Sequence, residues 1–393
     1  MPRDLPTPYR PHVLFAAYQT GRGSNGGMES ATQIFEALAG ECDWTLLTNR
    51  ETARTARWRA GGARVIVQPL SDTRPRPLRA LQLGLWSLRL RALARGSGPA
   101  PVSVLHSNDI RAAQALMPVA RNSGLPLLHT IRDTKCPGEA YGPQWRRLAR
   151  QATGIVTLSR DMAAMVSAAL PEAAGKLTTV NSLVDLERFR PAPDRAALKT
   201  ELGLSPDELS VGIVAGVFAK KGQLEFLSEV APGLVAAQPR IRIHLLGDFD
   251  PVGNGYARAC AAAVERAGIG GHVRFHGFSD RVAEWTAAFD IVVVPSVREG
   301  LARCMIEAMA CGVPVVSTEV CSAREMLEET GAGRVVQQGD AAGMAAALQD
   351  LAADPEACAR AGSTGRAAAE RLFSLGTLAE RWRTLYSAGG EKT

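Results

Sequence analysis

Two acidic residues, Glu299 and Glu307, lie in the segment with the densest chemical pattern, VPSVREGLARCMIEAMACGVPVVST over residues 294–318. A predicted helix starts just after Gly300, and its free backbone N–H groups and positive dipole end favour a phosphate. Gly300 lets the backbone approach that phosphate closely. A phosphate would repel the two carboxylates, which are better explained as acceptors of hydrogen bonds from ribose or hexose hydroxyls. The segment predicts a site for a phosphorylated ligand rich in hydroxyl groups.

A basic pair, Lys220 and Lys221, precedes Gly222 in the segment GVFAKKG over residues 216–222. Lysines at the start of a helix are unfavourable unless an anion lies nearby. The pair therefore predicts a second phosphate contact, and the alternative is a pair of surface lysines.

A glycine-rich turn, which contains Gly26 and Gly27, follows the first predicted strand. Two residues without a Cβ atom allow the backbone to approach a ligand closely. A plain tight turn or a degenerate dinucleotide loop are the alternatives. The turn GRGSNGG at 21–27 lacks G-x-G-x-x-G spacing, and no acidic residue closes a following strand, which disfavours a dinucleotide oxidoreductase.

The elements that must position these residues are short apolar runs that alternate with helical segments. In the first half, strands are predicted at residues 12–17, 44–48, 64–68, 102–106, 125–130 and 154–159, with a helix at 28–39. In the second half, strands are predicted at 210–215, 242–246, 273–275, 291–295, 314–317 and 334–336, with helices at 222–230, 257–267 and 304–310. Such runs are typical of parallel strands buried on both faces, so two doubly wound α/β layers are expected.

The length of 393 residues suits two domains. We predict an N-terminal Rossmann-like domain over 1–190 on the acceptor side, a C-terminal Rossmann-like domain over 191–373 that binds the donor, and a final helical segment over 374–393 that can pack back on the first domain. The linker is expected within 188–207. Leu378, Trp382 and Leu385 line one side of the final helix. Two such domains facing a central cleft would bind a ligand at the carboxyl ends of both sheets.

The composition indicates a globular protein, with 46% hydrophobic and 21% charged residues. The net charge of +6 is uneven: residues 1–190 hold 25 Lys and Arg against 14 Asp and Glu, a net of +11, and the remainder has a net of −5. Seven scattered cysteines without a C-x-x-C pair predict neither a disulfide framework nor a zinc site. Without a signal peptide or an apolar run of about 18 residues, we expect a cytoplasmic protein, which lies at the inner membrane face if residues 73–95 contact lipid.

The segment around Glu299 and Glu307 resembles the E-x7-E motif of the retaining glycosyltransferases of family 4, which have the GT-B fold. Other segments fit the same family in the expected order, from about residue 12 to 386. The resemblance implies that Glu299 contacts the donor sugar and that Glu307 binds the nucleotide ribose. It also implies that Lys220, Lys221 and the helix start at Gly300 and Leu301 hold the diphosphate.

Three departures from the family pattern are present. Many members carry His at the position of Arg132, near the reacting sugar phosphate; a guanidinium can stabilise the departing diphosphate but cannot act as a base. Val217 stands where the family often has Arg, and Lys220 can reach the same phosphate. Ser182 and Leu183 depart from the hinge segment. His129 is predicted to be a buried strand histidine, and Phe278 lies against the base or in the core.

The stretch over residues 73–95 mixes arginines with leucines and one tryptophan. An interfacial amphipathic helix on an anionic membrane combines these features. The alternative is a solvated helix whose leucines face the core. Nucleic acid is not expected as a partner, because no basic-aromatic motif of a known reader is present.

The sequence thus predicts an enzyme that transfers a hexose-type sugar from a nucleotide diphosphate donor, with retention, to a saccharide or lipid-linked saccharide acceptor. The product would be a cell-envelope polysaccharide or glycolipid. Glu299 and Arg132 are the candidate catalytic residues. Gly27 is assigned to the donor and Gly26 to the acceptor side, and neither a metal nor a cofactor is predicted. The alternatives are a nucleotide-sugar epimerase or phosphorylase of the same fold, a non-catalytic nucleotide-sugar-binding protein, and a dinucleotide oxidoreductase.

Overall fold

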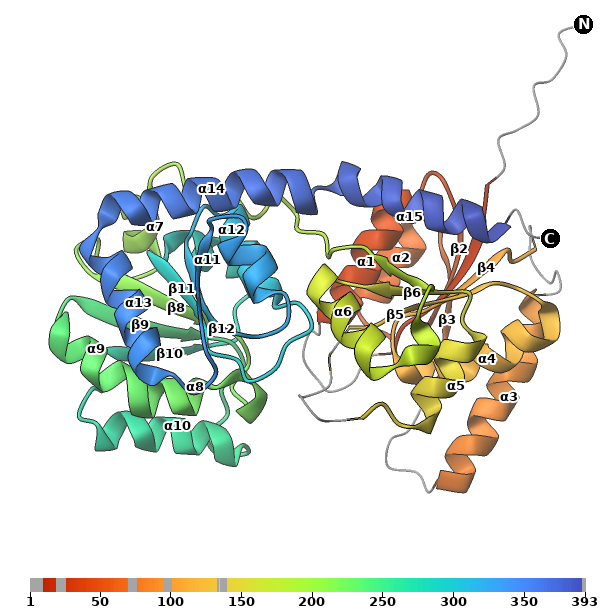
Figure 1. Cartoon of the computed structure of the whole chain (residues 1–393), viewed down its shortest axis with the longest axis horizontal. Coiled ribbons are helices and arrows are strands. Elements are labelled where there is room, and N and C mark those ends of the chain that lie inside the picture. Colours follow the sequence, from red (N-terminus) through yellow and green to blue (C-terminus); the bar gives the residue numbers. More distant parts are fainter. Residues whose placement is uncertain are drawn as a thin grey trace, which may run out of the picture. The chain divides into compact units, whose positions relative to one another are not determined.

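The computed structural model describes residues 10–18, 26–69, 76–94, 101–132, 134 and 140–390. The chain divides into two compact units (Figure 1). The first consists of Met1–Leu158, Ala163–Leu183 and Gly376–Thr393, and the second of Ser159–Met162 and Val184–Leu375. The main division therefore falls between Leu183 and Val184, and the end of the chain returns to the first unit.

The described part of the first unit contains a parallel sheet with the strand order β3-β2-β1-β4-β5-β6-β7. The strands are β1 (His12–Ala16), β2 (Asp43–Thr48), β3 (Arg64–Val67), β4 (Val104–Ser107), β5 (Leu127–Thr130), β6 (Gly154–Thr157) and β7 (Leu177–Thr179). The strands predicted in the first half are confirmed. The edge strand β7 was not predicted, because its three residues, Leu-Thr-Thr, form no apolar run; none of them is fully buried.

Helices connect the strands of the first unit. They are α1 (Gly26–Leu38), α2 (Ala53–Ala60), α3 (Arg76–Ala94), α4 (Ile110–Ser123), α5 (Pro143–Gln151) and α6 (Arg160–Ala169), with a short 3₁₀ turn at Pro171–Ala173. Helix α4 shows how local sequence sets the ends. The Asp109 carboxylate accepts hydrogen bonds from the N–H groups of Arg111 and Ala112, and Gly124 ends the helix with a φ of 73°. A cap of this kind stabilises a helix by about 1 kcal/mol.

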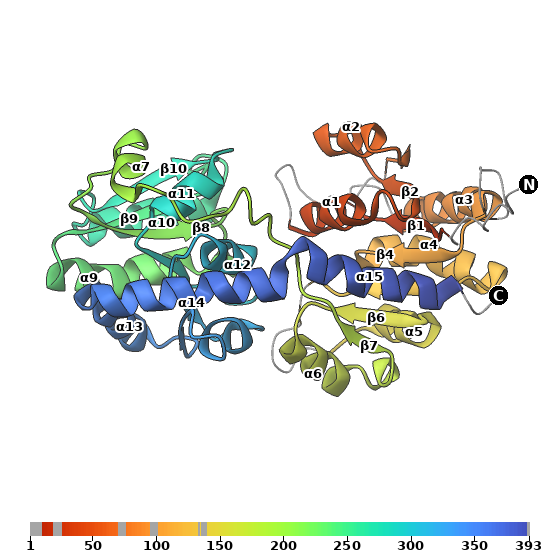
Figure 2. The ribbon, with the colours of Figure 1, turned by 90° about the horizontal axis from the view of Figure 1, so that it is seen from above.

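The last helix, α15 (Leu375–Gly390), packs on the sheet of the first unit (Figure 2). The Trp382 ring lies 5.0 Å from the His106 ring on β4, and the Tyr386 hydroxyl is 2.8 Å from Nδ1 of the same histidine. Leu378 and Trp382 are buried, as the amphipathic pattern predicts. The prediction that the C-terminal helix packs on the first domain is confirmed.

The described part of the second unit contains a parallel sheet with the order β10-β9-β8-β11-β12-β13. The strands are β8 (Leu209–Val214), β9 (Ile241–Leu246), β10 (Val273–Gly277), β11 (Ile291–Val294), β12 (Val315–Thr318) and β13 (Gly333–Val336). All were predicted within two residues of their ends. Both sheets thus follow the doubly wound order that the alternation of strands and helices predicts.

The helices of the second unit are α7 (Arg195–Glu201), α8 (Gln223–Glu225), α9 (Ala231–Ala237), α10 (Gly255–Arg266), α11 (Val282–Ala288), α12 (Arg303–Ala310), α13 (Ala341–Ala353) and α14 (Pro355–Phe373). A 3₁₀ turn at Ala219–Lys221 and π-helical turns at Phe226–Val230 and Arg324–Glu328 complete them. Helix α7 lies inside the segment predicted as a linker, so that prediction was wrong there. The Asp194 side chain caps α7 by accepting from the Ala197 N–H group.

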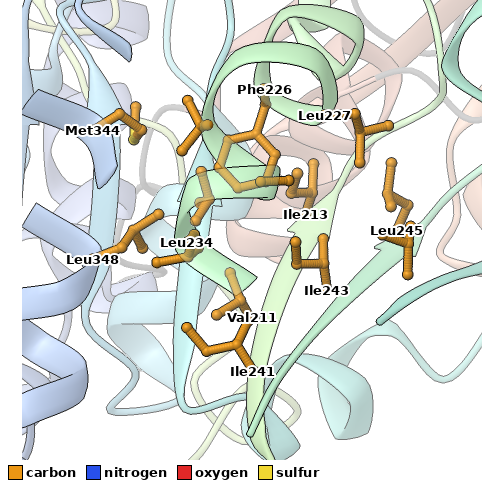
Figure 3. Close-up of a cluster of buried hydrophobic side chains, with 14 of the residues drawn as sticks. Val211, Ile213, Phe226, Leu227, Leu234, Ile241, Ile243, Leu245, Met344 and Leu348 are labelled. Atoms are coloured by element: carbon orange, nitrogen blue, oxygen red, sulfur yellow. The ribbon is translucent and has the colours of Figure 1, made fainter. Parts of the chain in front are cut away.

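The core of the second unit forms between the sheet and the helices on one of its faces (Figure 3). Alternate residues of neighbouring strands point to this side, including Val211 and Ile213 on β8 and Ile241 and Ile243 on β9. Phe226, Leu234, Met344 and Leu348 from the helices cover them. Full burial of one such side chain contributes about 1.5–3 kcal/mol. The packed sheet holds the loops at its carboxyl edge in place.

Candidate functional site

The strand order of the second sheet identifies where a ligand is expected. Strand β8 lies between β9 and β11, so the chain leaves β8 and β11 toward opposite sides of the sheet. In doubly wound sheets, ligands bind at the carboxyl ends of the strands at such a switch point. The loops that begin there carry the predicted candidates Lys220, Lys221, Glu299 and Gly300.

Lys221 and Glu299 come together at this switch point. The Lys221 Nζ atom lies 2.5 Å from Glu299 Oε1, and the Ser296 hydroxyl donates to the same oxygen at 2.8 Å. The two charged side chains are 18% and 7% exposed. Two opposite charges that are this shielded from water interact more strongly than a surface pair. The residues predicted for the diphosphate and the donor sugar are therefore direct neighbours.

Backbone contacts fix this arrangement. Gly222 has a φ of +69°, and a Cβ atom on it would lie 1.9 Å from the Pro295 carbonyl oxygen at the end of β11. The Val297 N–H group donates to the Lys220 carbonyl at 2.9 Å. Glycine is therefore required at residue 222, and the loop of the basic pair is held against the loop of Glu299.

The second carboxylate, Glu307, lies on α12 and is not a solvated helix position. The Arg303 guanidinium contacts it at 3.2 Å, and both side chains are largely buried. Arg303 was not predicted as a site residue, although its spacing of four residues from Glu307 is that of a helical ion pair. The helix begins at Arg303, so Leu301 and Ala302 form the turn that leads into it.

Cys304 lies between these charged groups on the first turn of α12. Burial raises the pKa of the Cys304 thiol to about 12, against the opposing effect of the Lys221 charge. The thiol is therefore neutral at physiological pH and is not a nucleophile.

Ser322 supports the Glu299 loop from the next strand connection. Its hydroxyl donates to the Gly300 carbonyl at 2.8 Å, and the side chain is fully buried. Its φ of 75° is the one positive value of a non-glycine residue among the described residues. Because a peptide unit is planar and trans, holding the Gly300 carbonyl also fixes the direction of the Leu301 N–H group. Sequence reasoning missed Ser322, since no local pattern reports this contact.

In the first unit, the predicted residues Gly27 and Arg132 are joined by a residue that was not predicted. The Asn108 side chain donates to the Gly27 carbonyl at 2.9 Å and accepts from the Arg132 Nε atom at 2.7 Å. Gly26 and Gly27 begin α1, and Asn108 follows β4. Strands β1 and β4 form the switch point of the first sheet, as β8 and β11 do in the second. Arg132 also lines a small pocket of this unit with Ser30 and Asn181.

His129 is a buried strand histidine, as predicted. Burial and, to a lesser degree, the Arg132 charge lower the pKa of His129 to about 3. Burial likewise keeps the pKa of His106 well below its usual value. Both imidazoles are neutral near pH 7, so neither supplies a positive charge beside Arg132.

The exposure of Phe278 decides between its two predicted positions. Phe278 is 73% exposed, so it does not pack in the core. Asp248 and Asp250 form an Asp-x-Asp pattern, and Asp250 accepts from the N–H groups of Val252 and Gly253 in a turn. In the part of the chain that the structure describes, no group of three or more His, Cys, Asp or Glu residues could hold a metal ion.

Two family models match most of the chain. Residues 25–181 match the glycosyl transferase 4-like domain, and residues 208–354 match the glycosyl transferases group 1. The chain therefore belongs to the glycosyltransferases that combine these two domains. The first match includes the Asn108 and Arg132 cluster, and the second includes Lys221, Glu299 and Glu307.

Curated proteins that are similar to this chain are also named glycosyltransferases. The D-inositol 3-phosphate glycosyltransferase of Streptomyces bingchenggensis (strain BCW-1) is 33% identical over 202 residues, which are 50% of this chain and 44% of that protein. The putative glycosyltransferase EpsD of Bacillus subtilis (strain 168) is 26% identical over 279 residues, which are 68% of this chain and 71% of EpsD. The match thus spans less than half the length of the first of these relatives.

Solved structures share the fold. The Anabaena protein Alr3699/HepE, in complex with UDP and glucose, has a TM-score of 0.80 at 20% identity and covers 96% of this chain and 100% of its own. Sucrose-phosphate synthase from Thermosynechococcus elongatus has a TM-score of 0.81 at 21% identity, with 96% and 99% covered. The predicted GT-B fold, with two Rossmann-like domains, is confirmed.

Proposed function

We propose that this glycosyltransferase transfers a hexose-type sugar, with retention, from a nucleotide diphosphate donor to a saccharide or lipid-linked saccharide acceptor. The observation that carries the proposal is the contact between Lys221 and Glu299 at the switch point of the second sheet. It combines a cation suited to phosphate with a carboxylate suited to sugar hydroxyls. The nearby Arg303–Glu307 pair offers a second carboxylate for the ribose.

The proposed role of each group follows from its chemistry. Lys220, Lys221 and the backbone N–H groups after Gly300 hold the diphosphate, because cations and oriented N–H dipoles stabilise the charge that grows on a departing phosphate. Glu299 orients the hexose and Glu307 the ribose. Neither a metal nor a further cofactor takes part, so chelation with EDTA leaves the rate unchanged.

The first unit supplies the acceptor side and one further charge. Arg132, fixed by Asn108, stabilises the departing diphosphate as a permanent cation and does not act as a base. Gly27 approaches the donor and Gly26 the acceptor. The net charge of +11 on residues 1–190 favours an anionic acceptor. The bound UDP and glucose of the Anabaena relative make UDP-hexoses the first donors to test.

A screen of UDP-, GDP- and ADP-sugars against the full chain tests the proposal. We expect one donor class to raise the unfolding temperature and to be hydrolysed slowly, and we expect both effects to weaken in Glu299→Gln and Glu307→Gln. Glu356→Gln is the matched control, because the Glu356 side chain is 89% exposed on α14. If no nucleotide sugar binds, the proposal is wrong, and if a donor is fully converted without an acceptor, an epimerase is indicated instead.

A further inference from the structure

Helix α3 is held in the first unit by one face. Trp86 and Leu90 are buried there, and the Trp86 ring lies 5.3 Å from the Tyr18 ring. The Ser87 hydroxyl donates to the Ala115 carbonyl of α4 at 3.1 Å. Because this face is anchored by both rings and a hydrogen bond, the orientation of the helix about its axis is set.

The opposite face carries a stripe of exposed leucines. Leu78, Leu81, Leu85 and Leu88 are 50%, 62%, 55% and 58% exposed. Their spacing of three, four and three residues places them on one side of a helix. Other large exposed apolar side chains among the described residues are scattered over several elements, among them Val252 and Phe278. The alternative in which the leucines of this stretch face the core therefore fails for these four.

The positive charge of α3 favours an anionic partner for the leucine stripe. Its 19 residues include four arginines and no acidic residue. Arg89 is exposed and directly follows Leu88 of the stripe. Two copies of α3 packed through their leucines would bring the two Arg89 side chains close together, and α3 has no carboxylate to pair with them. A partner with an apolar layer beneath anionic groups can bury the leucines and pair with Arg89 at the same time.

We propose that this leucine face of α3 docks on an anionic lipid membrane, with the helix lying in the plane of the interface. The leucines enter the acyl boundary, and Arg89 contacts lipid phosphates. No helix in the described ranges is long and apolar enough to cross a membrane. This proposal goes beyond the proposed reaction and does not depend on it.

Vesicle flotation of the full chain tests this surface. The probes are vesicles of phosphatidylcholine alone and of phosphatidylcholine mixed with phosphatidylglycerol. We expect the wild type to float with the anionic vesicles only and to be released by high salt. The triple variant Leu81→Ser, Leu85→Ser, Leu88→Ser should bind at least about tenfold more weakly, and Arg89→Gln roughly fivefold more weakly. Val252→Ser, at an apolar position outside α3 that is 85% exposed, should bind like the wild type.

Since the substituted leucines are exposed, the triple variant should retain the wild-type circular dichroism and unfolding temperature. The proposal is overturned if this folded variant floats like the wild type, or if the wild type binds neither vesicle. It is also overturned if the wild type is a dimer in solution that the triple variant converts to monomers, because the leucine face then pairs two copies of the chain. Donor hydrolysis without vesicles should be unchanged in the variant, which keeps this test separate from the proposed reaction.

Discussion

The two units share one topology but place different chemistry at equivalent points. At the switch point of the second sheet, opposite charges meet in largely buried pairs, Lys221 with Glu299 and, on α12, Arg303 with Glu307. At the switch point of the first sheet, a neutral amide, Asn108, joins a glycine carbonyl to one arginine. The same fold thus supports charged pairs in the second unit and a neutral amide network in the first.

The largest expected effect is on donor turnover, and it compares the charged pair of the second unit with the Asn108 network of the first. We expect Glu299→Gln to lower donor turnover by about 10²–10³-fold, because it removes the charge that we propose orients the reacting sugar and breaks the ion pair with Lys221. Asn108→Ala should lower it by about tenfold only, because Arg132 and Gly27 stay in place but are held less firmly. Steady-state rates with the donor that the nucleotide-sugar screen identifies measure both. A larger loss in Asn108→Ala would reverse the assignment.

The next effect concerns the backbone that brings the charges together. Gly222→Ala should reduce the free energy of unfolding by about 3 kcal/mol, because its Cβ atom meets the Pro295 carbonyl and its φ is positive. Gly268→Ala is the control: its φ is +67°, but no atom lies within 4 Å of the added Cβ. That variant should lose about 1 kcal/mol. Urea unfolding distinguishes them, and equal losses would mean that the close approach to β11 does not matter.

A smaller effect is expected at Ser322. Ser322→Ala should cost about 1–3 kcal/mol of stability, because the hydrogen bond to the Gly300 carbonyl is lost while the positive φ remains. Ser322→Gly loses the same bond but relieves the backbone strain, so it should be more stable than the alanine variant by about 1 kcal/mol. Thermal unfolding of the two variants gives the difference. An alanine variant that is the more stable of the two contradicts this account of the strain.

The smallest effect compares the acid sensitivity of the two units. The folded pKa values of His129, about 3, and His244, about 4, lie below the ordinary value of 6.5. The unfolded chain therefore binds more protons than the folded chain below pH 6.5, and stability falls as the pH falls through this window. Protonating either buried imidazole costs stability, so the protection of β5 and of β9 from hydrogen exchange should fall as the pH falls below 6.5. Protection that rises at low pH in either strand would contradict the assignment.

Local sequence patterns predict the parts of this molecule that depend on local physics. Apolar runs predict the strands because a parallel sheet buries both faces, and the order of strand, loop and helix identifies the Glu299 segment. Asn108, Arg303 and Ser322 were missed because their roles depend on contacts with Gly27, Glu307 and Gly300 that only the folded chain creates. The stretch over 73–95 left two alternatives open because leucines occur on both sides of its helix, and only burial shows that Trp86 and Leu90 are the anchors.

The central claim is that the second unit binds a nucleotide sugar through its paired charges. Calorimetric titration of UDP-, GDP- and ADP-hexoses into the full chain, the wild type beside Glu299→Gln, Glu307→Gln and Glu356→Gln, tests it most directly. The account predicts saturable binding of one donor class by the wild type and by Glu356→Gln, with affinity reduced at least about tenfold in the other two variants. Binding that is equal in all four proteins, or absent for every donor, would contradict it.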